Sequence, residues 1–309
     1  MILLWGLAHE APLAAVGAAL RRAGVPFRLL DQEDVATTRV EHRRGRSRLT
    51  WDAVSLDLDD VSGGYLRPYG PDQIGVLANA DPAGAAWRHA MRINAWMWAW
   101  ADTTSARIIN RPSAMESNHA KPWQHALIRA HGFALPDTLV TNDPDAARRF
   151  WRRHGEVIIK SVSSRRSIVR RLAREDRDRL ADLAHCPVQL QSWIQGRDVR
   201  VHVLRDQVFA LEISAEGDDY RYASNGFRVM PCVLPAAWAR RCVALVRSTG
   251  LVFGGVDLRR TPDGRWFCFE INPSPAFTFF GEEHSEVVAA ALAEELAKVQ
   301  ALPQWRSCS

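Results

Sequence analysis

The pattern of hydrophobic and polar residues along the chain predicts a mixed α/β protein. A buried-strand pattern at residues 2–7 is followed by helical spacing at 11–23 and a second strand pattern at 25–30. Strand, helix and strand within about thirty residues form a βαβ unit. The turn after Gly6 lacks the GxGxxG pattern of a dinucleotide site, so we interpret this unit as a scaffold.

The later patterns continue this mixture of strands and helices. Apolar positions within the basic segment 40–58 predict edge strands, and a helix at 83–101 carries tryptophans at a spacing typical of a core. No basic residue lies between the tryptophans at 96, 98 and 100, which disfavours a base-stacking platform. Further strands are predicted at 63–68, 107–110, 136–141, 157–160, 168–172, 188–194, 196–204 and 208–214, and further helices at 118–132, 144–154, 238–250 and 285–300.

A hairpin is predicted around the sequence TPDG at 261–264, where Pro and Gly favour a tight turn. If residue 261 pairs with residue 264, Asp257 lies opposite Cys268, and Glu270 is its diagonal neighbour, roughly 7–8 Å away at the backbone. Asn272 continues the same face. Carboxylate and amide oxygens suit Mg²⁺, so the hairpin predicts a metal site for nucleotide phosphates. A one-residue bulge would separate the acids, and an ordinary hairpin with two exposed acids is the alternative.

The order Asp257, then Glu270-Ile271-Asn272 after a hairpin, resembles the metal-binding end of the ATP-grasp superfamily. The resemblance is to ribosomal protein S6:glutamate ligase and to the graspetide (microviridin-type) peptide maturases. A second similar segment is the strand at 188–194, followed by Asp198-x-Arg200.

The resemblance covers roughly residues 111–297 and implies an ATP-grasp fold. It predicts an N-terminal Rossmann-like pre-ATP-grasp domain at 1–112, a central small αβ lobe at 113–187 and a C-terminal αβ lobe at 188–309. ATP is then expected between the last two lobes.

The resemblance also implies phosphate contacts from basic and hydroxyl side chains. Lys160 ends an apolar strand and would reach the phosphates, and Lys121 would do so from the start of the second lobe. Only three lysines occur in the chain, so a role as ordinary surface lysines is less expected. Ser163 and Ser164 stand where the family has a phosphate lid, here without glycine. Arg221 would stabilise the charge of an acyl phosphate, or else is an exposed loop arginine.

The hinge and the strand after it are expected to bind the nucleoside. Asp198 would accept the ribose hydroxyls and Arg200 would bind a phosphate or the substrate carboxylate, unless the two form a structural ion pair. The family's hinge acid is replaced by serine here, which leaves backbone contacts to adenine. The hinge residues assigned to adenine are Gln191, Ser192, Trp193 and Ile194.

Composition limits the classes of ligand and the cellular location but does not identify the substrate. The chain of 309 residues has a net charge of +5, which favours an anionic ligand without demanding nucleic acid. Acids at 175, 176 and 178 dilute the arginines at 165–179, which also disfavours nucleic acid. Five cysteines without a CxxC pair argue against a disulfide framework or structural zinc. The N-terminal apolar run ends at His9-Glu10, too soon for a signal peptide or membrane span, so a cytoplasmic protein is expected.

We therefore predict an ATP-dependent carboxylate–amine or carboxylate–hydroxyl ligase that uses Mg²⁺, or Mn²⁺ in its place, and forms an acyl phosphate. The substrate carboxylate would belong to a ribosomal peptide. The alternatives are a small-molecule or amino-acid ligase, an ATP-grasp-like kinase, and an ATP-binding module without turnover. A homodimer is left open.

Arginines at 39, 43, 44, 46 and 48 surround the predicted N-terminal edge hairpin. An acidic peptide could dock there through charge-assisted contacts and edge-strand addition. The alternative is a solvated basic loop that keeps the protein soluble.

Overall fold

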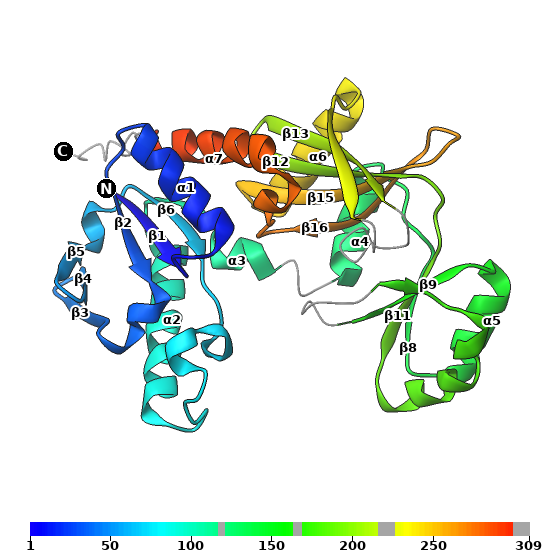
Figure 1. Cartoon of the computed structure of the whole chain (residues 1–309), viewed down its shortest axis with the longest axis horizontal. Helices are drawn as coiled ribbons and strands as arrows, with labels where there is room; N and C mark the ends of the chain where they lie inside the picture. Colours follow the sequence, from blue (N-terminus) through cyan, green and yellow to red (C-terminus); the bar gives the residue numbers. More distant parts are fainter. Residues whose placement is uncertain (117–120, 163–168, 216–225, 299–309) are drawn as a thin grey trace, which may run out of the picture. The chain divides into compact units, whose positions relative to one another are not determined.

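The computed structural model describes residues 1–116, 121–162, 169–215 and 226–298, apart from the side chains of 121 and 122 (Figure 1). The chain forms two compact units, one of Met1–Met115 with Ala276–Ser309 and one of Glu116–Pro275. Both contain sheets and helices, which confirms the mixed α/β class. No helix in the described ranges is long and apolar enough to cross a membrane.

The first unit is built on a parallel four-stranded sheet in the order β2-β1-β6-β7. Strands β1 and β2 run parallel with α1 between them, so the predicted βαβ unit is confirmed. Helix α7 packs against α1, beside the sheet (Figure 1). The bounds are β1 (Ile2–Gly6), α1 (Ala11–Arg22), β2 (Phe27–Asp31), β6 (Gly63–Arg67), β7 (Arg107–Ile109), α3 (Pro112–Met115) and α7 (Glu282–Ala297).

A second layer in this unit consists of α2 (Ala85–Thr103) and a three-stranded antiparallel sheet of β3 (Arg39–Arg43), β4 (Arg46–Trp51) and β5 (Val54–Asp57). These elements share one hydrophobic core with the parallel sheet. The rings of Trp5 and Trp98 meet edge to face at 5.2 Å. The strands predicted within 40–58 are thus confirmed, and the partly buried Trp96, Trp98 and Trp100 of α2 pack against this core as predicted.

The closing helix α7 is held in the first unit by Arg107. The Arg107 guanidinium donates to the carbonyl oxygens of Glu295 at 2.8 Å and Lys298 at 2.7 Å, which satisfies the C-terminal end of the helix. The contacts therefore group this helix with the N-terminal residues, whereas the predicted third lobe extended to residue 309. The three-lobe division itself stays a prediction.

The second unit contains a small antiparallel sheet in the order β10-β9-β11-β8, covered on one face by α5. Helix α5 has the bounds that the sequence predicts. It begins at Pro144 because the Asp143 side chain caps it and accepts from the Asp145 N–H at 2.8 Å. The bounds are β8 (Thr138–Thr141), α5 (Pro144–His154), β9 (Val157–Ser161), β10 (Arg170–Arg171) and β11 (Val188–Ser192).

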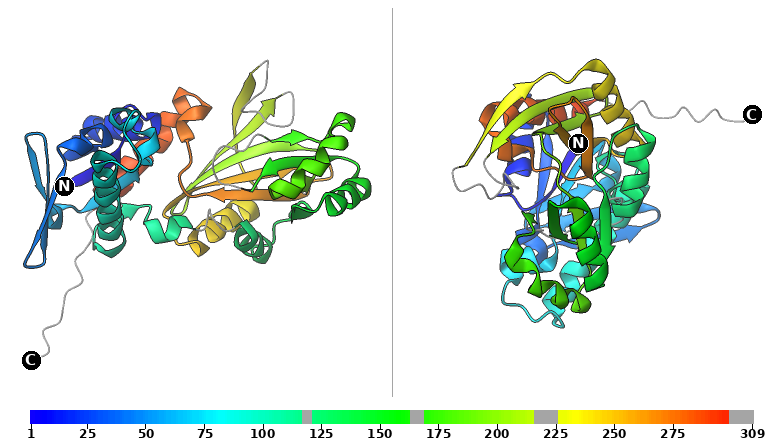
Figure 2. Two further views of the ribbon diagram at one scale, coloured as in Figure 1. Left: turned by 90° about the horizontal axis from the view of Figure 1, so that it is seen from below. Right: turned by 90° about the vertical axis from the view of Figure 1, so that its right-hand side faces the viewer.

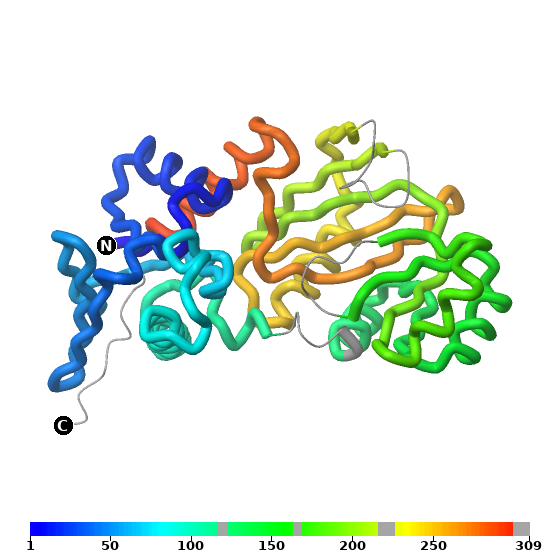
Figure 3. Tube along the Cα trace, turned by 60° about the horizontal axis from the view of Figure 1, so that its bottom comes forward, coloured from blue at the N-terminus to red at the C-terminus, as the bar shows by residue number. Residues whose placement is uncertain are grey.

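The same unit contains a five-stranded antiparallel sheet in the order β14-β13-β12-β15-β16, whose strands run side by side in Figure 3. Figure 2 shows α6 against one face of this sheet. Strand β14 escaped sequence prediction because Pro231 interrupts its pattern. The bounds are α4 (Lys121–Ala130), β12 (Arg197–Leu204), β13 (Gln207–Ala215), β14 (Phe227–Cys232), α6 (Ala236–Ser248), β15 (Phe253–Arg260) and β16 (Trp266–Asn272).

The face of this sheet that α6 covers is apolar, and its two thiols are buried. Val201, Val256 and Ile271 are buried on it, and α6 contributes the thiol of Cys242. Burial raises the pKa of Cys242 to about 12 and that of Cys268 well above its usual value. These thiols are core residues, and the opposite face carries the polar side chains.

The outer edge of β16 is anchored by a side chain of α4. The buried Gln124 amide donates to the Ile271 carbonyl oxygen at 2.9 Å and accepts from the Ile271 N–H at 3.2 Å. Such a two-way contact satisfies both backbone groups as a further strand would. Gln124 thereby fixes the strand that carries Glu270 and Asn272.

Candidate metal and nucleotide site

The β15–β16 hairpin places its two acids directly opposite each other. Asp257 pairs with Glu270 and Leu258 pairs with Cys268, so the predicted Asp257–Cys268 register is wrong. Directly opposite residues lie closer than diagonal ones, with Cβ atoms roughly 4.5–5.5 Å apart. Both carboxylates are half-buried. The two acids therefore share one face of the hairpin, as the predicted metal site requires, and they lie closer together than the predicted diagonal placement.

Two one-residue irregularities produce this register. The Thr261 N–H donates to the Arg265 carbonyl oxygen, and Gly264 has φ +84°, so the loop is one residue longer than predicted. This shift alone would turn Glu270 away from Asp257. A second register shift between Asp257 and Leu258 leaves Phe269 without an opposite residue and restores the parity.

Arg200 lies beside Asp257 on the other neighbouring strand. The two residues are register partners across β12 and β15, and the guanidinium forms an ion pair with the carboxylate. Arg200 is buried, and its Nε lies 3.4 Å from Nε2 of the buried His202. A Cβ atom on Gly255 would lie only 2.5 Å from Nη2 of Arg200. The missing side chain at Gly255 therefore makes room for the guanidinium.

Asp198 forms an ion pair with a residue of the neighbouring strand β15. Its register partner is Arg259, which donates to it through Nε at 2.6 Å and Nη2 at 2.9 Å. Arg259 also donates to the Ile194 carbonyl oxygen at 2.8 Å. Its guanidinium lies 4.9 Å from the centre of the Trp193 ring. Arg259, oriented by Asp198, thus ties the hinge to the large sheet.

The hinge residues are held by hydrogen bonds to neighbouring strands. Ser192 Oγ accepts from the Asp137 N–H at 3.0 Å, and the Ser192 N–H donates to the Asp137 carbonyl oxygen at 2.9 Å. Gln191 is buried and donates to Thr138 Oγ1 at 3.1 Å. Serine at position 192 therefore has a structural role at the start of β8. The contacts of all four hinge residues with adenine stay a prediction.

Lys160 lies on the small sheet beside a residue that the sequence analysis missed. Gln189 is its register partner and is only 1% exposed, yet neither Oε1 nor Nε2 has a hydrogen-bond partner among the residues that the structure describes. Gln189, Gln191 and Lys160 share the face opposite the α5 core, because Leu190 points into that core. The alternation of glutamines with apolar residues in β11 was the available signal. A buried unpaired amide suggests a ligand contact.

Several predicted residues cannot be assigned contacts. Ser163, Ser164 and Arg221 lie outside the described residues, as does the side chain of Lys121, whose backbone begins α4. Their roles stay predictions.

The residues of the hairpin suit a small hard cation. In the described ranges, no group of three or more His, Cys, Asp or Glu side chains is placed to bind a metal ion. The predicted set has instead two carboxylates and the amide of Asn272, whose Oδ1 accepts from the Ser274 N–H at 2.9 Å. Mg²⁺ commonly takes one or two carboxylates and completes its shell with phosphates and water. The donor set fits this cation when a nucleotide is present.

A family profile, that of the RimK-like ATP-grasp domain, matches residues 118–296. The chain is 28% identical to beta-citrylglutamate synthase B of Danio rerio over 202 residues, which is 61% of this chain and 50% of that protein. The chain thus spans about half the length of the curated relatives it matches.

Two solved structures share the fold over nearly the whole chain. The macrocyclase MdnC of Microcystis aeruginosa MRC, bound with precursor peptide MdnA, has a TM-score of 0.81 at 20% identity, with 96% of this chain and 98% of that chain covered. The ATP-grasp ligase PsnB, complexed with a precursor variant, Mg and ADP, has a TM-score of 0.78 at 26% identity, with 96% and 97% covered. The predicted ATP-grasp fold is confirmed.

Proposed function

Because this chain belongs to the RimK-like ATP-grasp family, we propose that it is an ATP-dependent ligase that joins a carboxylate to an amine or hydroxyl. The observation that carries the proposal is one polar sheet face on which Asp257 lies between Glu270 and Arg200. Two acids and a buried arginine at the end of a β-hairpin suit a metal–phosphate complex. We expect the reaction in the cytoplasm, where ATP is available.

Each side chain has a defined task in this proposal. Asp257, Glu270 and Asn272 would hold Mg²⁺, or Mn²⁺ in its place, which when bound neutralises phosphate charge. Lys160 would pair with the phosphates from the small sheet, on the face it shares with Gln189. The nucleotide would then lie between the central and C-terminal lobes.

The proposed reaction proceeds in two steps. A carboxylate oxygen of the substrate attacks the γ-phosphorus, the bond to the bridging oxygen breaks, and ADP leaves. The amine or hydroxyl then attacks the acyl carbon, the bond to the phosphate oxygen breaks, and the nucleophile's proton passes to solvent. Negative charge gathers on oxygen in both steps. Arg200, held by His202 and packed over Gly255, is positioned to stabilise that charge.

Two substrate classes are supported by different similarities. A peptide carboxylate is favoured by PsnB, which was solved with a precursor peptide and is 26–28% identical. A small acid or amino acid is favoured by the relatives named beta-citrylglutamate synthase and N-acetylaspartylglutamate synthase. We take the peptide as the first candidate because PsnB is similar over nearly its whole length.

The experiment is a screen for ADP release with ATP and Mg²⁺ against acidic peptides and amino acids, with hydroxylamine as a second nucleophile. With hydroxylamine, a ligase gives a hydroxamate. With the natural nucleophile, its product has the mass of the two joined reactants less one water. A kinase gives a product that has gained a phosphoryl group and no hydroxamate. Tight ATP binding without ADP release under any condition would indicate a binding module, and either of these last results would contradict the proposal.

A further inference from the structure

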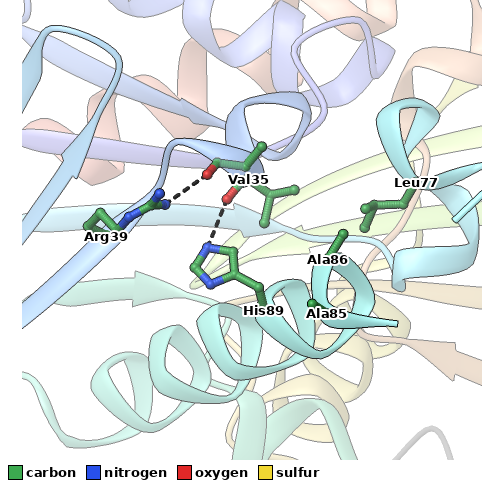
Figure 4. Close-up of a pocket in the computed structure, with 7 residues that line it drawn as sticks. Val35, Arg39, Leu77, Ala85, Ala86 and His89 are labelled. Carbon is green, nitrogen blue, oxygen red and sulfur yellow. Dashed lines mark hydrogen bonds between the residues drawn. The ribbon is translucent and has the colours of Figure 1, made fainter. Parts of the chain in front are cut away.

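The first unit contains a pocket at the base of strand β3, of about 500 Å³. Val35 and Leu77 are buried in its wall, and Ala85 and Ala86 in the first turn of α2 leave its rim open (Figure 4). Its complete lining is Val35, Ala36, Arg39, Leu77, Ala85, Ala86 and His89, which we call the root pocket. An apolar wall with few polar groups is typical of a site for an apolar side chain.

The wall of the root pocket is fixed by hydrogen bonds. His89 Nε2 lies 3.1 Å from the carbonyl oxygen of Val35 (Figure 4) and 3.1 Å from that of Thr38. Because carbonyls only accept, this nitrogen carries the proton. The Glu33 carboxylate accepts from the N–H groups of Gly75 and Val76 at 2.8 and 2.9 Å, which fixes the turn that carries Leu77. The pocket is therefore pre-formed rather than a gap between loose side chains.

Arg39 connects this pocket to strand β3. Its Nη1 donates to the carbonyl oxygens of Ala36 at 2.8 Å and Thr38 at 2.9 Å, which orients the guanidinium. The N–H groups on Nε and Nη2 make no hydrogen bond to the described residues. An oriented guanidinium with spare donors suits a carboxylate beside the pocket.

The strands β3 and β4 with their turn, residues 39–51, form what we call the arginine hairpin. Leu49 and Trp51 are buried, so the alternate residues of β4, with their partners on β3, face away from the core. On that face Arg48 is paired with Asp57 at 2.6 Å. Arg46 is 84% exposed and lies 3.9 Å from its nearest acid, a weak surface contact.

The tip of the arginine hairpin holds an arginine in an unfavourable backbone conformation. Arg44 has φ +53° and Gly45 has φ +78°, which is a type I′ turn. Asn is the preferred residue at the first of these positions, and a left-handed conformation costs other residues roughly 1–2 kcal/mol. Arg43 and Arg44 form no ion pair with any described residue. The tip therefore presents positive charge that neighbouring acids do not neutralise.

Strand β3 is also an edge. Its only partner in the described part of the chain is β4, so its other side offers backbone groups to a further strand. Arg39 and Arg43 flank the exposed Glu41 on β3, so antiparallel pairing of two copies about Glu41 would set arginine against arginine and acid against acid. An extended segment of opposite charge meets no such barrier.

We propose that the arginine hairpin and the root pocket together dock an acidic peptide segment with one large apolar residue. The apolar side chain enters the root pocket, Arg39 binds a carboxylate beside it, and further acids lie beyond Glu41, at the tip beside Arg43, Arg44 and Arg46. The docked peptide would be the substrate of the proposed ligase, and only in this respect does the inference rest on the proposed function.

The test uses a short fluorescein-labelled peptide of Glu and Ser around a central Leu, with binding to the full chain measured by fluorescence anisotropy at low salt. No ATP is added, so a failure here is distinct from a failure of ATP turnover. The docking variant is Arg43→Ser with Arg44→Asn and Arg46→Ser, in which Asn relieves the turn. We expect about tenfold weaker binding, from three exposed charge contacts.

A matched control removes the same charge elsewhere. Arg22→Ser, Arg152→Ser and Arg153→Ser change exposed arginines of α1 and α5 and should leave the affinity unchanged. Equal affinity of the docking variant and the wild-type chain would overturn the proposal. So would wild-type binding of the peptide with Lys in place of Glu, or displacement of the acidic peptide by an equally charged DNA strand at lower concentration.

The pocket is tested separately with a peptide in which Ser replaces Leu. The wild-type chain should bind this peptide several-fold more weakly. Ala86→Phe fills the rim and should abolish the difference, whereas Ala99→Phe, at another exposed position of α2, should retain it. If the wild-type chain binds the Leu and Ser peptides equally, the root pocket is not the anchor and the proposal is overturned.

Discussion

Asp257 and Glu270 lie directly opposite each other across β15 and β16, and the Arg200 guanidinium pairs with Asp257 from β12. Two carboxylates this close repel each other unless a cation lies between or beside them. Arg200 offsets part of that repulsion. A divalent cation bound beside the pair would reduce it further, and we propose the metal site here.

Replacing either acid should abolish turnover without unfolding the chain. Asp257→Asn and Glu270→Gln each remove one anionic ligand, and we expect ATP-dependent ADP release to fall at least about a hundredfold. Asp182→Asn, an exposed acid of the same unit, is the control. Circular dichroism verifies the fold. Near-normal ADP release by either variant would remove the metal assignment.

Lys160→Met should weaken nucleotide binding. The ammonium is expected to pair with a phosphate on a half-buried sheet face, so its loss should lower affinity for a non-hydrolysable ATP analogue about tenfold or more. Titration calorimetry measures the affinity, with the exposed Arg153→Met as control. An unchanged affinity would make Lys160 a surface residue.

Gln189→Leu should have opposite effects on stability and on binding. The buried amide has no hydrogen-bond partner in the described part of the chain, so leucine should raise the melting temperature, with about 1 kcal/mol gained. If the amide contacts the nucleotide, the same variant should bind the ATP analogue more weakly. Greater stability with unchanged affinity would show that Gln189 does not contact the nucleotide.

Gly255→Ala should disturb Arg200. The added Cβ would lie 2.5 Å from Nη2 of Arg200 and 2.9 Å from Cβ of Pro275, so the guanidinium must move away from Asp257. We expect kcat/KM to fall roughly tenfold to a hundredfold. In Gly254→Ala the added Cβ lies on the opposite face of the sheet, against Val246, so this variant should change stability rather than turnover. Equal losses of activity in both variants would contradict this account of Gly255.

Asp176→Asn should destabilise the small lobe in a pH-dependent way. The Arg170 guanidinium and the Ala173 N–H hold the pKa of Asp176 at about 2, below its usual 3.8. A lowered pKa stabilises the fold above the unfolded-state value and loses that effect as the pH falls through about 2. The variant should therefore lose roughly 2 kcal/mol at pH 7.

Thermal melts of both proteins between pH 7 and pH 2 test this. The gap between their melting temperatures should be full at neutral pH and close in the acid range. A gap that does not change with pH would mean that Asp176 stabilises the fold by packing rather than by charge.

The sequence by itself determined the elements whose signals are local. Helix α5 follows from Asp143 and Pro144 at its start, and the hairpin turn follows from Pro262 and Gly264, because capping and turn preferences act over a few residues. The placement of Asp257 and Glu270 on the two strands of one hairpin was also predictable, since a hairpin brings its own two strands together.

The tertiary structure decided the rest, because those relationships depend on residues far apart in the chain. The second bulge, at Phe269, sets the parity of the two acids, and no turn signal marks it. Pairing of Asp198 with Arg259 depends on how β12 meets β15, some sixty residues later. The lack of a partner for the Gln189 amide is likewise a property of its surroundings, because burial without a hydrogen bond cannot be seen along one strand.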